Sequence, residues 1–99
     1  MTLKLITQEH SFEEPGTLTN QTIDVGGAIY DGKATIVLVA FDAEFSDEKD
    51  HHLKKVTAKI KNIKVKEASI DYDLEFNFKD DSDHLGKGRI TILAVADVN

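Results

Sequence analysis

The clearest pattern along the chain is a two-residue alternation of apolar and polar side chains between residues 69 and 79. The apolar positions are Ile70, Tyr72, Leu74, Phe76 and Phe78, and the polar positions are Asp71, Asp73, Glu75 and Asn77. Successive side chains of a β-strand point to opposite faces, so this period predicts a strand with one buried face over Ser69–Lys79. Within Leu53–Val65, the apolar residues Val56, Ala58 and Ile60 alternate in the same way, and the apolar positions then shift to Ile63 and Val65. We expect the two to form an antiparallel hairpin, because a lysine-rich outer face then lies beside an acidic one.

Four further segments have the composition of strands, and turn residues separate them. Pro15-Gly16 favours a turn, Gly26-Gly27 favours a bulge or a corner, and the Asp31-Gly32 step precedes a strongly apolar run. The predicted strands are a short edge strand at Thr2–Gln8 and longer ones at Thr17–Val25, Ala34–Phe41 and Arg89–Val98. The sequence therefore predicts an all-β fold, an antiparallel β-sandwich of about six strands that forms a single domain over residues 1–99.

A helical alternative exists at one place in the chain. Leu53, Val56 and Ile60 fit a helical spacing within Asp47–Lys61. The β-branched residues from Val56 onward and the matching partner strand favour the hairpin instead.

Two of the predicted strands are apolar on both faces. Ala34–Phe41 is almost continuously hydrophobic, and Arg89–Val98 carries Leu93 and Val95 opposite its other apolar set. The outer face of an antiparallel sheet normally contacts water, so two such strands require a second cover. We expect a partner subunit to supply it, which predicts a homo-oligomer assembled through these strands.

Composition narrows the class of function. The chain has 18 acidic and 12 basic residues, a net charge of −6, and Arg89 as its one arginine. Binding to nucleic acid takes most of its affinity from clustered Lys and Arg, so no nucleic-acid partner is expected. No segment has the apolar length for membrane insertion, and the N-terminus lacks the pattern of a signal peptide. We expect a soluble protein that is cytoplasmic or secreted by a non-classical route.

Candidate chemistry is confined to two loops rich in acids and histidine, Asp47–His52 and Asp80–His84. Such side chains can bind calcium or zinc, so a metal-dependent binder is one alternative. Asp81-x-Asp83 begins like a calcium loop, but Leu85 stands where a third oxygen ligand belongs. Solvated loops explain the composition better, and no metal or cofactor is expected.

The chain also lacks the usual signs of catalysis. It has no cysteine and no glycine-rich phosphate loop, and Gly86-Lys87-Gly88 is too short to form one. The acids of Ser69–Lys79 face predicted lysines, which keep carboxylates ionised. His10 is expected at the surface. We therefore expect a protein that is not an enzyme.

The order of features from Pro15 to Val98 resembles the H-type lectin domain. The segments that carry the resemblance are Glu14-Pro15-Gly16, Ala34–Phe41 leading into Leu53-Lys54-Lys55-Val56, Asn62-Ile63 before Ile70–Phe78, and Ile90–Val98. The resemblance implies a six-stranded antiparallel sandwich, assembly as a trimer, and binding of N-acetylgalactosamine-type sugars.

The resemblance also implies a ligand-binding region, with departures from the family pattern. Lys55 stands where the family places a sugar-binding arginine, and Phe78-Lys79 stands where it places an aromatic residue and a histidine. Thr17 and Leu18 follow Gly16 in place of an acidic sugar ligand, and there is no tryptophan. The expected ligand contacts are Gly16, Lys55, Phe78, Lys79 and His84. A structural protein that assembles without a small ligand is the other alternative.

Overall fold

Six strands make up the part of the chain described by the computed structural model, residues 2–45 and 52–99. They are β1 (Thr2–Phe12), β2 (Gly16–Asp24), β3 (Ile29–Glu44), β4 (Leu53–Val65), β5 (Ser69–Asp80) and β6 (Lys87–Val98). The described residues contain no helix, and hence none that is long and apolar enough to cross a membrane. The all-β prediction is confirmed.

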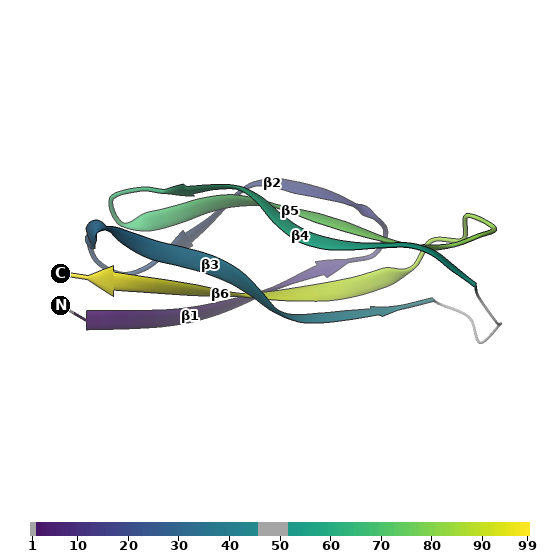
Figure 1. The fold of residues 1–99 in the computed structure, drawn as a ribbon, viewed down its shortest axis with the longest axis horizontal. Coiled ribbons are helices and arrows are strands. Elements are labelled where there is room, and N and C mark those ends of the chain that lie inside the picture. Colours follow the sequence, from purple (N-terminus) through teal and green to yellow (C-terminus); the bar gives the residue numbers. More distant parts are fainter. Residues whose placement is uncertain (1, 46–51) are drawn as a thin grey trace.

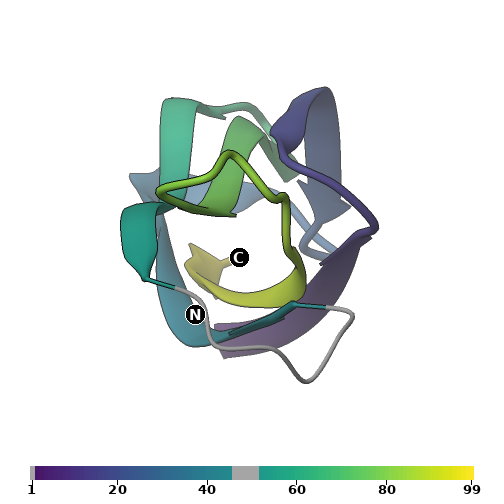
Figure 2. The ribbon, with the colours of Figure 1, turned by 90° about the vertical axis from the view of Figure 1, so that its right-hand side faces the viewer.

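The strands form two antiparallel sheets of three, with the orders β1-β6-β3 and β2-β5-β4. Figure 2, which looks down the long axis of the molecule, shows the two sheets facing each other across that axis. The molecule measures 52 × 19 × 16 Å. Both chain termini lie at one end, and the loop after β5 lies at the other (Figure 1). The predicted sandwich of about six strands is therefore confirmed.

The hairpin of β4 and β5 has the predicted pairing. Lys59 lies opposite Glu75, and Lys61 lies opposite Asp73, so basic and acidic side chains share the outer face. The register shifts between Lys61 and Lys64, where Asn62 has a φ of 54°. This bulge is the physical reason for the change of apolar parity in the sequence near Ile63. The helical alternative is wrong from Leu53 onward, and Asp47–His51 lie outside the described residues.

Two strands extend further than the sequence predicts. β1 continues beyond Gln8 to Phe12, whose side chain is buried in the core. β3 begins at Ile29 and runs through the Asp31-Gly32 step. Asp31 and Gly32 both have positive φ, and the pairing with β6 is interrupted between Ile29 and Ala34. The step is therefore a bulge within one strand and not a turn before it.

The prediction that His10 lies at the surface is wrong. It is half-buried between the sheets, and its Nε2 lies 2.6 Å from the hydroxyl of Tyr72 on β5. Burial lowers the pKa of His10 and raises that of Tyr72 to about 12. Both groups are therefore neutral near pH 7, and their hydrogen bond links the two sheets across the core.

The core lies between the sheets and draws on both of them. Its buried apolar residues are Phe12, Ile23, Val25, Ile36, Ile70, Tyr72, Leu74, Phe76, Ile90, Ile92, Ala94, Ala96 and Val98. At the end away from the termini, Gly86 and Gly88 let the rings of Phe78 and Phe76 approach the backbone of the chain: a Cβ on either glycine would overlap the facing ring. The role of Gly86 and Gly88 is therefore to let these two rings pack against the backbone.

Candidate functional site

The outer face of the β2-β5-β4 sheet is polar, and its carboxylates have partners. Asp73 accepts hydrogen bonds from the Asn62 amide at 2.7 Å and from the backbone N–H of Asn20 at 2.9 Å. These bonds hold the pKa of Asp73 below its usual value. The hydroxyl of Thr22, with help from Lys66, does the same for Asp71. Carboxyl groups whose pKa is lowered, as those of Asp71 and Asp73 are, stay ionised at neutral pH and are unsuited to act as general acids.

The outer face of the β1-β6-β3 sheet is largely apolar over its half nearest the chain termini, where Asp97, the partner of Leu3, is the charged exception. Leu5 and Thr35 flank Val95, and Val37 lies opposite Leu93. Leu3 is 65% exposed, Leu5 62% and Val37 43%. We call Leu3, Leu5, Val37, Leu93 and Val95 the apolar face. The predicted doubly apolar strands are thus neighbours, β3 and β6, and β1 widens the surface that they present.

The other half of this outer face is charged and forms a shallow hollow of about 250 Å³. Arg89 donates a hydrogen bond to Asp42 at 3.1 Å and lies 3.8 Å from Glu9, while Lys87 lies 3.7 Å from Glu44. The bond to Asp42 raises the pKa of Arg89. The sequence pointed to no such cluster, because its members come from three distant strands. All of its cations are paired with carboxylates, which makes it a set of surface ion pairs.

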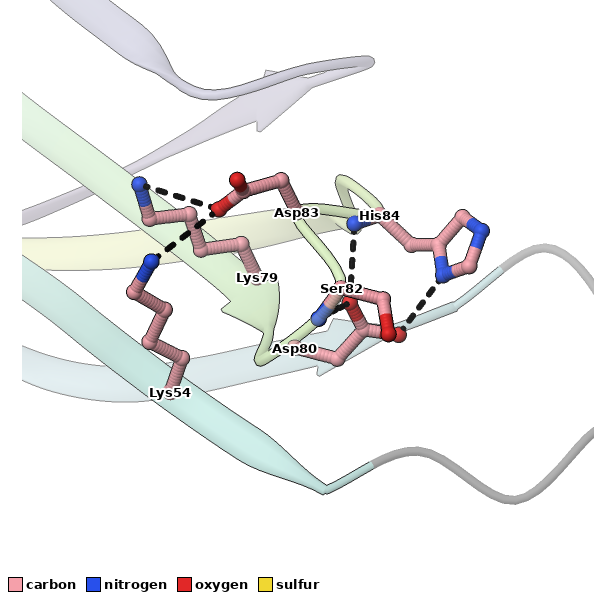
Figure 3. Close-up of polar contacts among 6 residues, drawn as sticks. All are labelled: Lys54, Lys79, Asp80, Ser82, Asp83 and His84. Atoms are coloured by element: carbon pink, nitrogen blue, oxygen red, sulfur yellow. Dashed lines mark hydrogen bonds and ion pairs between the residues drawn. The ribbon is translucent and has the colours of Figure 1, made fainter.

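The loop after β5 is organised by the carboxylate of Asp80. This side chain is 4% exposed, and it accepts hydrogen bonds from the backbone N–H groups of Ser82 and His84 at 3.0 and 2.8 Å. Its second oxygen lies 2.9 Å from Nδ1 of His84 (Figure 3). The bonds fix the loop and hold the ring of His84 at the end of the molecule.

Lysines gather beside this loop. Asp83 lies 3.3 Å from the ammonium group of Lys54 and 3.8 Å from that of Lys79 (Figure 3). Lys55 is the cross-strand partner of Lys79. The proximity of Lys55 to the Phe78-Lys79 step, which an antiparallel hairpin implies, is therefore observed. We call Lys54, Lys55, Lys79 and Asp83 the loop-end cluster. The ring of His84 points away from Lys54 and Lys79 (Figure 3).

Two other expected ligand contacts, Phe78 and Gly16, also do not join the loop-end cluster. The ring of Phe78 stacks on that of Phe45, with 4.6 Å between their centroids, and packs against the core. Phe78 and Lys79 are consecutive in a strand, so their side chains take opposite faces of the sheet. Gly16 pairs with Phe76 on the other flank of β5. The five residues thus lie toward one end of the sandwich without converging on one surface.

His52, the one described residue of the first acidic and histidine-rich loop, lies beside the second of these loops. The backbone N–H of Asp81 donates to the carbonyl of His52 at 2.8 Å. Asp47–His51 lie outside the described residues. Within residues 2–45 and 52–99, no three side chains of the metal-binding types come together. The described part of the chain therefore gives no geometric support to a metal centre.

Comparison of the chain with family models, with curated proteins and with solved structures gave no match. Its function must therefore be argued from its own surfaces.

Proposed function

We propose that the protein is a non-enzymatic binding module that works as a homo-oligomer. The observation that carries this proposal is the contrast between the two outer faces. The face of β2-β5-β4 is covered by paired charges, whereas the apolar face presents Leu3, Leu5 and Val37 to solvent beside Leu93 and Val95. Contiguous apolar surface of this kind favours association with another protein surface. A second copy of the chain is always available as a partner, and the resemblance to H-type lectins favours three copies.

The assembly is tested by placing a charge on the apolar face. Val37→Lys sets an ammonium group on this face, on the edge strand β3 beside Leu93, where burial against a second copy costs several kcal/mol. We expect the wild-type protein to have at least three times the mass of the chain in light scattering, and the variant to lose this three-fold association.

A matched control carries the same charge on the opposite face. Thr17 is exposed and pairs with Glu75 on the outer side of β2, so Thr17→Lys should leave the mass unchanged. A wild-type protein that is monomeric at micromolar concentration, or a Val37→Lys variant that keeps the wild-type mass, would contradict the proposal.

For the ligand we propose a glycan, bound at the loop-end cluster. Lys54, Lys55 and Lys79 supply ammonium donors, and Asp83 supplies an acceptor, within one exposed region. Sugar hydroxyls are recognised by such combinations of donors and acceptors. The class of sugar, N-acetylgalactosamine and related amino sugars, comes from the resemblance alone.

Calorimetric titration of the assembled protein with N-acetylgalactosamine tests this second part. We expect binding by the wild-type protein and at least a tenfold weaker affinity for Lys55→Ala, which corresponds to about 1.4 kcal/mol. Lys59→Ala removes a lysine from the same strand away from the loop and should bind normally. If amino sugars give no heat of binding, the glycan proposal fails, and the assembly protein without a small ligand takes its place. A rise in melting temperature with calcium, reversed by a chelator, would instead favour the metal-dependent binder.

A further inference from the structure

The two sheets have four edge strands, and three of them are interrupted by bulges. β2 changes register between Leu18 and Gln21. β3 does so between Ile29 and Ala34 and again near Val39, and β4 does so on both sides of its centre, at Lys54 and at Asn62. Bulges twist an edge strand away from flat geometry and hinder pairing with another chain. The bulges therefore protect the edges of β2, β3 and β4 from pairing with another chain.

The fourth edge, β1, has no such protection. It pairs with β6 in one unbroken register from Thr2↔Val98 to Phe12↔Gly88. Its residues Thr2–Leu5 are all exposed, and its outward side chains there are the leucines Leu3 and Leu5. It contains no proline, and Lys4 and Glu9 are its only side chains with a permanent charge. A long edge strand with an unbroken register is a template for addition of a further strand.

We infer that β1 pairs with β1 of a second copy, antiparallel and about a two-fold axis at Leu5, so that a continuous six-stranded sheet crosses the interface. A two-fold axis closes the pair, whereas parallel addition leaves an open edge that continues to grow. In this register Leu5 lies opposite Leu5, and Leu3 lies opposite Thr7. The paired segment is Thr2–Gln8, and it places no two charged side chains opposite one another.

Other registers of the β1–β1 pair are less favourable because of the residues that they would bring opposite one another. Opposed residues must share a face of the sheet, so the axis passes through a single residue of β1. An axis at Lys4 or at Glu9 would oppose like charges. An axis at Ile6 or at Thr7 would set Glu9 against an exposed leucine. An axis at Gln8 would set Leu5 against Ser11 and Lys4 against Phe12, so it lacks the pair of leucines.

This inference does not rest on the proposed assembly through the apolar face, since an edge uses backbone groups and the face uses side chains. Disulfide trapping separates the two, because the wild-type chain has no cysteine and each introduced thiol reports alone. Directly opposed strand residues have Cα atoms about 4.5–5.5 Å apart, within the range of a disulfide. Leu5→Cys is therefore expected to form a covalent dimer rapidly under mild oxidation, seen on a non-reducing denaturing gel.

The matched variants are Leu3→Cys, Thr7→Cys and Val37→Cys, all on the same outer face. Leu3→Cys and Thr7→Cys should form little dimer alone but should cross-link when mixed, because these positions face each other in the inferred register. Val37→Cys lies on the far edge strand and reports face-to-face packing. Melting of each reduced variant confirms that it folds. The inference is overturned if Leu5→Cys cross-links no faster than Val37→Cys, or if Leu3→Cys and Thr7→Cys do not cross-link when mixed.

Discussion

Replacing Gly88 with alanine is expected to lower the free energy of unfolding by roughly 3 kcal/mol, at the upper end of the usual range for overpacking. The added Cβ would lie 2.5 Å from the carbonyl oxygen of Asp42 and 2.7 Å from the nearest carbon of the Phe76 ring. One of these neighbours is backbone and the other is a fully buried ring, so neither moves without disturbing the sandwich. Denaturant unfolding at a fixed protein concentration measures the loss, since any oligomer makes the midpoint depend on concentration.

Gly16→Ala is the matched control for Gly88→Ala. Gly16 also lies in a strand, but a Cβ there would meet nothing within 4 Å. Its free energy of unfolding should stay within about 0.5 kcal/mol of the wild-type value. The double variant Gly88→Ala with Phe76→Leu tests the mechanism, because a smaller side chain at residue 76 relieves part of the overlap. The two substitutions should then cost less together than the sum of their separate effects. Equal losses for Gly88→Ala and Gly16→Ala would contradict this account.

Asp80→Ala is expected to lower the free energy of unfolding by about 2 kcal/mol and to free the loop that follows β5. The substitution removes the acceptor of the part-buried backbone N–H groups of Ser82 and His84, and the loss of such hydrogen bonds costs about 1–3 kcal/mol. His84 loses the contact between Nδ1 and the carboxylate as well. Unfolding measures the first effect, and faster amide exchange at residues 82–84 measures the second.

Two variants separate the role of Asp80 from the charge of the loop. Asp80→Asn keeps one oxygen acceptor for the backbone N–H groups, so it should lose less than half as much stability as Asp80→Ala. Asp83→Ala removes a carboxylate whose side chain is 68% exposed and whose partners are surface lysines. It should cost less than about 1 kcal/mol. A larger loss for Asp83→Ala than for Asp80→Ala would show that the ion pairs, and not the buried carboxylate, organise the loop.

The elements that the sequence predicted well are the strands whose own residues show the alternation and the charges that define them. β5 alternates strictly, β4 alternates up to Ile60, and the two have opposite charges on facing positions, so their ranges and their pairing followed from the pattern. The bulge near Ile63, which explains the shift of apolar parity there, was seen only in the structure. β1 and β3 were predicted too short, because their ends depend on partners elsewhere. Phe12 counts as an isolated apolar residue in the sequence and becomes core only where it packs on the ring of Phe76. His10 likewise became an interior residue because Tyr72 lies within hydrogen-bond distance.

The expected ligand contacts also divide into features that the sequence predicted and features that only the structure showed. The cross-strand pair of Lys55 and Lys79 followed from the hairpin, since antiparallel strands fix which residues face each other. The inward position of Phe78 also followed from its alternation with Lys79. The fixed position of His84 did not, because it depends on the buried carboxylate of Asp80. The ion pairs around Arg89 did not either, because they join β1, β3 and β6.

By itself, the sequence determined the class of fold, its central hairpin and the presence of two strands that are apolar on both faces. The periodicity and the charge of a strand are local properties, and both can be read from the order of its residues. Only the tertiary structure decided which strands are neighbours and which edges are open. It set β1, β6 and β3 side by side, which gathers their outer leucines and valines into one apolar face, and it left β1 as the edge without a bulge. Such surfaces arise from contacts between distant segments, whose geometry no single stretch of the chain contains.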